Sequence, residues 1–200
     1  MRPSWVRFLV SLVLFFALAT AAVHNAGHRW DVAVTEWLHR AAPAPDLPAA
    51  LYVFAGDAEV LVTVSVLAGF LLVRRDRMRA GAAFSLSASL AVLSVLALGL
   101  KHLLPHPGPP DALQRHVFRV GISVPAPYSF PSGHTIRTTF LAGTVLRRVP
   151  VVAIAALASM MASLVYLGDH WTSDVIGGLC LGWAAVEAAR MAWARLRNGV

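Results

Sequence analysis

The stretch FLVSLVLFF, from Phe8 to Phe16, is apolar at every position but one and lies inside a longer apolar segment, Ser4–Val23. A helix that crosses the hydrocarbon core of a bilayer needs about 20 mostly apolar residues. This segment therefore predicts a membrane-spanning helix. The alternative is a cleaved signal peptide, because two arginines precede the apolar run and small residues follow it; the length of the run favours a retained helix.

The composition of the whole chain supports a membrane protein. Of its 200 residues, 58% are hydrophobic and 14% are charged, with a mean hydropathy of +0.65. Soluble domains have about 45–50% apolar and about 25% charged residues. The net charge of +7 comes from short basic clusters between apolar runs rather than from a continuous basic stripe, so we expect no nucleic-acid partner.

Further apolar segments predict the rest of the fold. We expect an all-α, polytopic membrane protein with a bundle of six transmembrane helices, and a single domain over residues 1–200. Two of the spans share an apolar stretch that is interrupted by RRVP at residues 147–150. The segments after the first are Leu51–Val73, Ala80–Leu104, His134–Leu167 (two spans) and Val175–Trp193.

Arginine clusters near the span ends predict the orientation, because cytoplasmic loops of membrane proteins are enriched in Lys and Arg. The four clusters fall on one side of a six-span topology: Arg2 and Arg7; Arg74, Arg75, Arg77 and Arg79; Arg147 and Arg148; Arg190, Arg195 and Arg197. We therefore expect a protein of the inner (plasma) membrane with both termini cytoplasmic. The loops at 23–50, 102–130 and 168–174 then face the extracytoplasmic side.

The sequence Pro131-Ser132-Gly133-His134 lies where an outer loop turns into the fourth span. Serine is a favoured residue for capping a helix N-terminus, and glycine lets a ligand approach the backbone closely. Free amides and the helix dipole make such a turn an anion site. The simpler interpretation is an ordinary helix cap followed by a histidine at the membrane interface.

Two other features lie at the same predicted face. His170 and Asp174 are four residues apart, so they share one face of a helix, and an aspartate there can orient a histidine that acts as base or nucleophile. The simpler interpretation is a solvated pair at a helix start. Lys101 is the single lysine among 17 basic residues, which suggests a specific role, although it could extend to the interface as such side chains commonly do.

Together these residues resemble the type 2 phosphatidic acid phosphatase superfamily, membrane lipid phosphatases that share a pocket with vanadium haloperoxidases. The family pattern is Lys, six residues, Arg-Pro; then Pro-Ser-Gly-His; then Ser-Arg, five residues, His, three residues, Asp. Here the first part begins at Lys101, the second is complete at 131–134, and the third spans 163–174. The resemblance covers residues 101–174.

The resemblance implies a two-step phosphoryl transfer without a metal or other cofactor. His170 would attack phosphorus to form a phosphohistidine, Asp174 would orient it, and His134 would protonate the leaving group. Lys101, Ser132 and the amide of Gly133 would hold the phosphoryl oxygens. The implied partner is a phosphorylated lipid in the membrane.

Both arginines of the family pattern are replaced, by Gly108 and Leu164. Arginine pairs phosphate through two hydrogen bonds at once, so the site must be rebuilt or its activity is lost. Arg137 lies one helical turn after His134 and is our candidate replacement among the substrate-binding residues. Arg115 and Arg119 are weaker candidates, with a solvated or headgroup-binding role as the alternative.

The remaining polar residues have simpler interpretations. The histidine pairs His24/His28 and His102/His106 have helical spacing, but no carboxylate completes a metal site. Asp57 and Glu59 lie near a span end, where they are either solvated or part of the outer pocket. We expect interfacial anchoring from three of the tryptophans and simple packing from Cys180; the tryptophans are Trp30, Trp37 and Trp171.

The leading hypothesis is an integral-membrane phosphatase for a lipid phosphate. Phosphatidic acid, phosphatidylglycerol phosphate and polyprenyl (di)phosphates are the usual substrates of the family, and the sequence does not separate them. The alternatives are a lipid phosphotransferase and a catalytically weak relative that binds or transports a phosphorylated lipid. The oligomeric state is not determined by the sequence.

Overall fold

The computed structural model describes residues 3–41, 46–115, 117 and 125–197. These ranges contain eight α-helices and one short 3-10 helix, and no strand, which confirms the predicted all-α class. The elements are α1 (Ser4–Val23), α2 (His28–Ala41), α3 (Asp46–Ala55), α4 (Ala58–Leu72), α5 (Arg77–Leu103), η1 (Asp111–Leu113), α6 (Gly133–Thr144), α7 (Pro150–Tyr166) and α8 (Thr172–Arg197).

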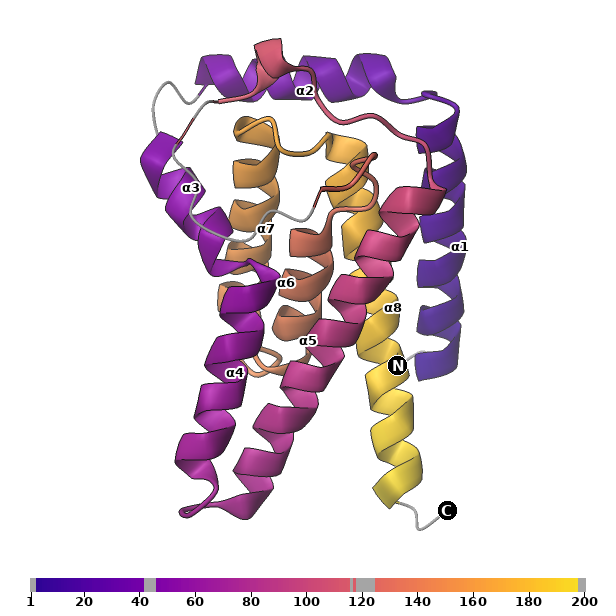
Figure 1. Ribbon diagram of the computed structural model, residues 1–200. Helices are drawn as coiled ribbons and strands as arrows, with labels where there is room; N and C mark the ends of the chain where they lie inside the picture. The colour runs from indigo at the N-terminus through magenta and orange to yellow at the C-terminus, as the bar shows by residue number, and fades with distance from the viewer. Residues whose placement is uncertain (1–2, 42–45, 116, 118–124, 198–200) are drawn as a thin grey trace.

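Most of the helices run lengthwise in one bundle, and α2 lies across one end of it (Figure 1). We call this the site end; it also holds the segment after α5 and the turn between α7 and α8. The first residues of α1, the last residues of α8, and the turns after α4 and α6 point toward the opposite end (Figure 1). The arginine clusters of the sequence belong to these helix ends and turns, so their described members share one end of the bundle; Arg2 lies outside the described residues.

The helices identify a membrane protein but do not confirm the predicted number of six spans. Three helices among the described residues, α1, α5 and α8, are long and apolar enough to cross a bilayer, and α3 with α4 makes a fourth if the bent pair is one span. With 12 residues, α6 rises only about 18 Å at 1.5 Å per residue, less than the roughly 30 Å hydrocarbon core.

The second predicted span is not one straight helix. It begins earlier, and it breaks between Ala55 and Ala58 with a bend of 51° between α3 and α4. At the break, a side chain on Gly56 would meet Met160, with only 2.6 Å to its Cε. Arg137 of α6 donates to the carbonyl oxygen of Gly56 from Nε at 3.1 Å and from Nη2 at 2.9 Å. The break is therefore held in place by two neighbouring helices.

The region predicted as a first outer loop contains a helix. In α2, Asp31 and Thr35 are buried against the bundle, whereas Trp30 and Trp37 are exposed, as interfacial anchors should be. Trp171 is different: it is only 2% exposed, and its Nε1 donates to the oxygen of Pro107 at 2.9 Å. The expectation that Trp171 is an interfacial anchor was wrong, because the segment after α5 covers it.

Close contact between α6 and α8 positions the site. A Cβ on Gly182 would lie 2.6 Å from Cβ of Thr139, and one on Gly178 would lie 2.6 Å from the oxygen of Ser132. Glycine is needed at both positions for the two helices to approach this closely. The amide of Ser132 then donates to the oxygen of Asp174 at 3.1 Å, which joins the beginning of α6 to the beginning of α8.

The opposite end of the bundle contains a buried carboxylate, Glu187 of α8. Arg7 of α1 donates to it from Nε and from Nη2, both at 3.0 Å, and Arg190 donates from Nη1 at 2.6 Å. These bonds tie α1 to α8, whose contact also includes a cluster of buried apolar residues around Phe15.

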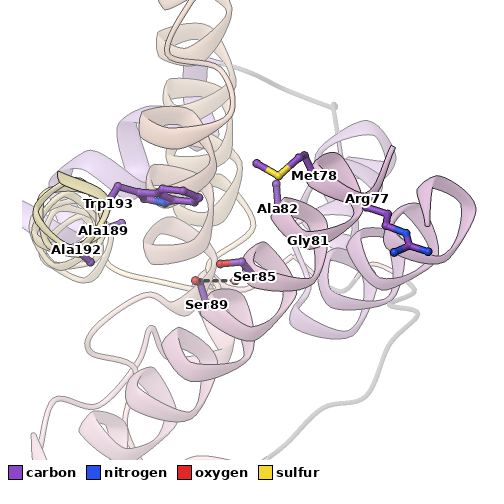
Figure 2. A pocket seen from close by; sticks show the side chains of 9 residues that line it. All are labelled: Arg77, Met78, Gly81, Ala82, Ser85, Ser89, Ala189, Ala192 and Trp193. Atoms are coloured by element: carbon purple, nitrogen blue, oxygen red, sulfur yellow. Dashed lines mark hydrogen bonds between the residues drawn. The ribbon is translucent and has the colours of Figure 1, made fainter. Parts of the chain in front are cut away.

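A small pocket of about 430 Å³ also lies toward this end, between α5 and α8. Figure 2 shows Trp193 of α8 and Met78 of α5 on opposite sides of it, with Ala189 beside Trp193 and Ala82 beside Met78. Of the described residues that line this pocket, Arg77 is the one with an ionisable side chain. The described residues of this pocket therefore include no side chain that could act as a general acid or base near neutral pH.

Candidate active site

A cleft of about 860 Å³ opens at the site end of the bundle, between α3–α4, α5 and α6 and the turn before α8. It brings together the residues that the three sequence motifs contribute, as predicted from the order of the spans. Five of the predicted site residues and positions line this one cleft: Lys101, Gly133, His134, Arg137 and His170.

His170 is the candidate nucleophile and lies in the turn between α7 and α8. Its Nδ1 is 3.3 Å from Oδ2 of Asp174, and the same oxygen accepts from the amide of Trp171 at 2.9 Å. Because the ring meets Asp174 through Nδ1, its Nε2 is left for the cleft. Burial, and next the charge of Lys101, lower the pKa of His170 from its usual 6.5, so the ring is neutral and keeps a lone pair at neutral pH.

The beginning of α6 is capped as the sequence predicted. Ser132 is the N-cap residue, and its Oγ accepts from the amide of Thr135 at 3.4 Å and from the Thr135 hydroxyl at 3.2 Å. Ser132 is fully buried and is not among the residues that line the cleft, whereas Gly133 is. A Cβ on Gly133 would be 3.1 Å from Nη1 of Arg137, so glycine keeps this wall of the cleft open.

His134, the candidate general acid, has a carboxylate partner. Its Nε2 is 2.7 Å from Oδ1 of Asp57, which lies at the break before α4 and also lines the cleft. The sequence left Asp57 and Glu59 between solvation and the outer pocket; both line the cleft. A carboxylate at this distance can fix the orientation of the imidazole, which a general acid requires.

Two cationic side chains face the same space. Lys101 lines the cleft from α5, and its ammonium makes no hydrogen bond or ion pair with any of the described residues. Arg137 lines it from α6, and its guanidinium contacts two different groups. Nε and Nη2 hold the oxygen of Gly56, while Nη1 lies 3.5 Å from Oγ of Ser94, another lining residue. The cleft can therefore attract an anion.

The two positions where the family pattern has arginine differ from each other. Gly108 lines the cleft, so its lack of a side chain leaves space there, and an added Cβ would be 3.4 Å from Cβ of Ser129. Leu164 is fully buried in an apolar cluster that includes Met160 and Leu167. One replacement thus empties part of the cleft wall, and the other extends the hydrophobic core.

Of the two weaker arginine candidates, Arg115 does not line the cleft; its guanidinium lies over the ring of Tyr166, 5.0 Å from the centroid. Arg119 lies outside the described residues. Sequence reasoning did not connect Asp31 and His106 with the site. His106 is 3.5 Å from Asp174, and Asp31 is hydrogen-bonded to Ser173, the residue before Asp174.

Comparison with known proteins agrees with this geometry. The family model described as the PAP2 superfamily matches residues 80–197, which is more than half of the chain. The chain belongs to the PAP2 superfamily. No curated protein sequence matches it. Among solved structures, it is similar to the crystal structure of a transmembrane PAP2-type phosphatidylglycerolphosphate phosphatase from Bacillus subtilis, with a TM-score of 0.79 and 18% sequence identity over 97% of this chain and 99% of that chain.

Membership in the PAP2 superfamily supports a phosphatase. The structural similarity extends over almost the whole chain, so α1 to α4, which lie before the matched region, are also part of the shared fold. Asp57 of this segment lies outside the family-model match and partners His134 within it.

Proposed function

We propose that this protein is an integral-membrane phosphatase that hydrolyses a lipid phosphate or a polyprenyl (di)phosphate through a phosphohistidine intermediate. The observation that carries the proposal is the pairing of two histidines with two carboxylates around one cleft. His170 is oriented by Asp174 and His134 is bonded to Asp57. One histidine then serves as nucleophile and the other as acid, which are the two roles that phosphoester cleavage needs.

In the first step, the lone pair on Nε2 of His170 attacks phosphorus, and the bond from phosphorus to the ester oxygen breaks. The protonated His134 gives its proton to the departing alkoxide. In the second step, His134, now neutral, takes a proton from water as the water attacks the phosphohistidine. The bond from phosphorus to nitrogen breaks, inorganic phosphate leaves, and both histidines return to their starting states.

The phosphoryl oxygens are held by Lys101, by Arg137 and by the amide of Gly133, with Ser132 fixing the turn that presents this amide. These donors are aimed at the charge that grows on the oxygens during transfer. Arg137 replaces one arginine of the family pattern from a different position in the sequence. No metal takes part in either step of this proposal.

A lipid substrate fits the apolar part of the cleft. Its wall includes Leu47, Leu51 and Phe54 of α3 and Val95 and Leu98 of α5. Leu47, Leu51 and Val95 are exposed, so in a bilayer these side chains contact acyl chains. A headgroup beside His170 would therefore have its tail in a hydrophobic environment.

For the topology, we propose six spans, with both termini cytoplasmic and the cleft extracytoplasmic. The support is the shared position of the arginine clusters at the end of the bundle opposite the cleft. In this topology, α6 is too short to cross the bilayer alone and crosses it together with the segments that flank it.

One observation favours a second candidate, a catalytically weak relative that binds a phosphorylated lipid. The cleft has lost the two arginines of the family pattern, and each charged donor aimed at a transition state contributes roughly 3–4 kcal/mol. The histidine–carboxylate pairs argue for catalysis, because binding alone needs neither a nucleophile nor an acid. A phosphotransferase would share the first step and replace water with another acceptor in the second.

The test is phosphate release by the purified protein in detergent with EDTA, from a panel of lipid phosphates and diphosphates. Phosphate released from at least one substrate, and abolished in His170→Ala, supports the proposal. The matched control is His102→Ala, which removes an exposed histidine of α5 that does not line the cleft. No release from any substrate by folded protein contradicts the proposal and favours the binding relative.

A further inference from the structure

A chain of buried polar groups lies behind His170, on the side away from the cleft. It begins with Asp174, which is fully buried and uses Oδ2 for His170 and for the amide of Trp171. The other oxygen, Oδ1, is buried and has no hydrogen bond within the described residues. The group nearest to it is Nε2 of His106, at 3.5 Å.

His106 follows α5 and is only 2% exposed. Its Nδ1 is 2.9 Å from the oxygen of Ala22, at the end of α1. A carbonyl oxygen only accepts, so Nδ1 must carry a proton. The edge of the ring packs against Phe130, with 6.3 Å between centroids and an interplanar angle of 85°. The ring is therefore fixed in orientation, with Nε2 directed toward α8.

Nε2 of His106 faces two oxygens. One is Oδ1 of Asp174, and the other is Oγ of Ser173 at 3.4 Å. Ser173 is itself held by Asp31 of α2: Oδ1 accepts from its amide at 2.8 Å, and Oδ2 accepts from its hydroxyl at 2.8 Å. A hydroxyl has one proton, and this one is used on Asp31. Ser173 can then only accept from His106.

The Nε2 of His106 therefore faces two acceptor oxygens, Oδ1 of Asp174 and Oγ of Ser173. An N–H on Nε2 would be shared between them. A lone pair on Nε2 would instead face the buried oxygen of Asp174, and neither group would hold the other in place. A fixed contact between His106 and Asp174 therefore requires the N–H on Nε2.

We propose that His106 is a positioning residue for the nucleophile: anchored to the oxygen of Ala22 through Nδ1, it directs Nε2 at Oδ1 of Asp174 and fixes that carboxylate against His170. The proposal rests on the proposed function, because it assigns His170 as the nucleophile. The charged and titratable groups that face His106 are Asp174 on α8, at 3.5 Å, and Asp31 on α2, which is connected to it through the hydroxyl of Ser173.

The kinetic test uses two variants of His106 in the full-length protein. His106→Leu removes both ring donors, and we expect kcat to fall about 10–100-fold while KM changes less than about twofold, because no contact with substrate is lost. His106→Gln keeps an amide donor that can reach Asp174, and it should restore most of the lost kcat. A residue with only a structural role would lower the yield of folded protein without this split between kcat and KM.

The matched control is His39→Leu. His39 of α2 also bonds a backbone oxygen, that of Tyr166 at 2.8 Å, but does not line the cleft. We expect a lower melting temperature and an unchanged kcat.

A spectroscopic measurement tests the network without substrate. In protein labelled with ¹⁵N in its histidine rings, the signals of His106 are assigned by their loss in His106→Gln. We expect the Nε2 signal of His106 to be that of a protonated nitrogen, because this nitrogen faces two acceptor oxygens. We also expect this signal to shift in Asp31→Asn, because Asp31 holds Ser173, one of those two acceptors.

The two proposals fail in different ways. An unprotonated Nε2 in the wild type, or a kcat in His106→Leu equal to that of the wild type, overturns the role of His106 and leaves the phosphatase intact. A doubly protonated His106 in a protein that releases no phosphate supports the network and contradicts the phosphatase proposal.

Discussion

Each end of the bundle contains a fully buried carboxylate on α8, and the two carboxylates have different partners. Glu187, at the opposite end, is bonded to Arg7 and Arg190, whose side chains are always protonated. Asp174, at the site end, faces His170 and His106, whose imidazole rings can carry one proton or two. A carboxylate paired with arginine holds helices together; one paired with histidine can support chemistry.

The largest effect should come from His170→Ala, which removes the nucleophile at the site end. We expect phosphate release to fall on the order of 10³–10⁶-fold, as when an essential nucleophile is removed. The measurement is initial-rate hydrolysis of the best lipid phosphate of the panel. A residual rate within tenfold of the wild type would mean that the histidine does not attack phosphorus.

The two carboxylates can be compared directly with amide variants. Asp174→Asn should lower kcat roughly 10³–10⁴-fold, because the amide holds His170 in the wrong tautomer. Its melting temperature should change little, since the amide keeps the shape of the side chain.

Glu187→Gln should do the reverse and leave kcat per folded molecule unchanged. Loss of the carboxylate charge should lower the free energy of unfolding by about 1–3 kcal/mol, less than the 3–5 of a fully buried pair because both arginines are about one-third exposed. Calorimetry of the two variants in one detergent gives the comparison. Loss of kcat in Glu187→Gln would show that the ends of the bundle are not functionally separate.

Arg137→Ala should reduce kcat/KM about 10²–10³-fold, the usual effect of removing one donor aimed at a transition state. Arg137 also holds the oxygen of Gly56, so the rates must be compared with the stability of the variant. Arg137→Lys keeps the charge but not the planar fork, and we expect it to recover only part of the activity. Full activity in Arg137→Ala would leave Lys101 as the main phosphate-binding cation.

A smaller effect is expected for Asp57→Asn, which removes the charge beside His134 and keeps an oxygen acceptor. We expect a decrease of about 10–100-fold with a lipid phosphate, since general acids contribute about 10²–10⁴-fold. With p-nitrophenyl phosphate, whose leaving group needs no proton, the decrease should nearly vanish. Equal losses of activity with both substrates would show that Asp57 stabilises the bend between α3 and α4 rather than the role of His134 as general acid.

The smallest expected effect concerns how kcat/KM of the wild type depends on pH. Protonation of His170 removes its lone pair, so kcat/KM falls on the acid side as His170 takes up a proton. Because burial lowers the pKa of His170, this fall should occur below 6.5, the usual value for histidine. The measurement is kcat/KM of the wild type from pH 4 to 8, and an acid limb at or above pH 6.5 would contradict the environment of the ring.

The residues with direct chemistry were identifiable from sequence because their spacing is local. His170 and Asp174 are one helical turn apart, and Ser132 precedes its helix directly, so the pattern alone predicts the pair and the cap. Their convergence with Lys101 follows from the order of the spans and a shared membrane face. This is why the cleft was predicted although only α1 matched its predicted bounds.

The missed features depend on distant contacts. The bend at Gly56 lies within an apolar stretch and depends on Arg137 and Met160, which come about 80 and 104 residues later by their sequence numbers. Asp31 and His106 lie 143 and 68 residues before Asp174 by their sequence numbers, and neither has a local partner that marks it. For Asp31, the amphipathic pattern of residues 28–41 was a usable signal, because it places Asp31 and Thr35 on one buried face.

The measurement that tests the central claim most directly is a single-turnover experiment with a ³²P-labelled lipid phosphate, quenched in denaturant and base. The account predicts a label on the wild-type protein that is stable in base and labile in acid, as a phosphohistidine is, and no label on His170→Ala. Rapid phosphate release without any labelled protein, or an equal label on His170→Ala, would contradict His170 as the nucleophile.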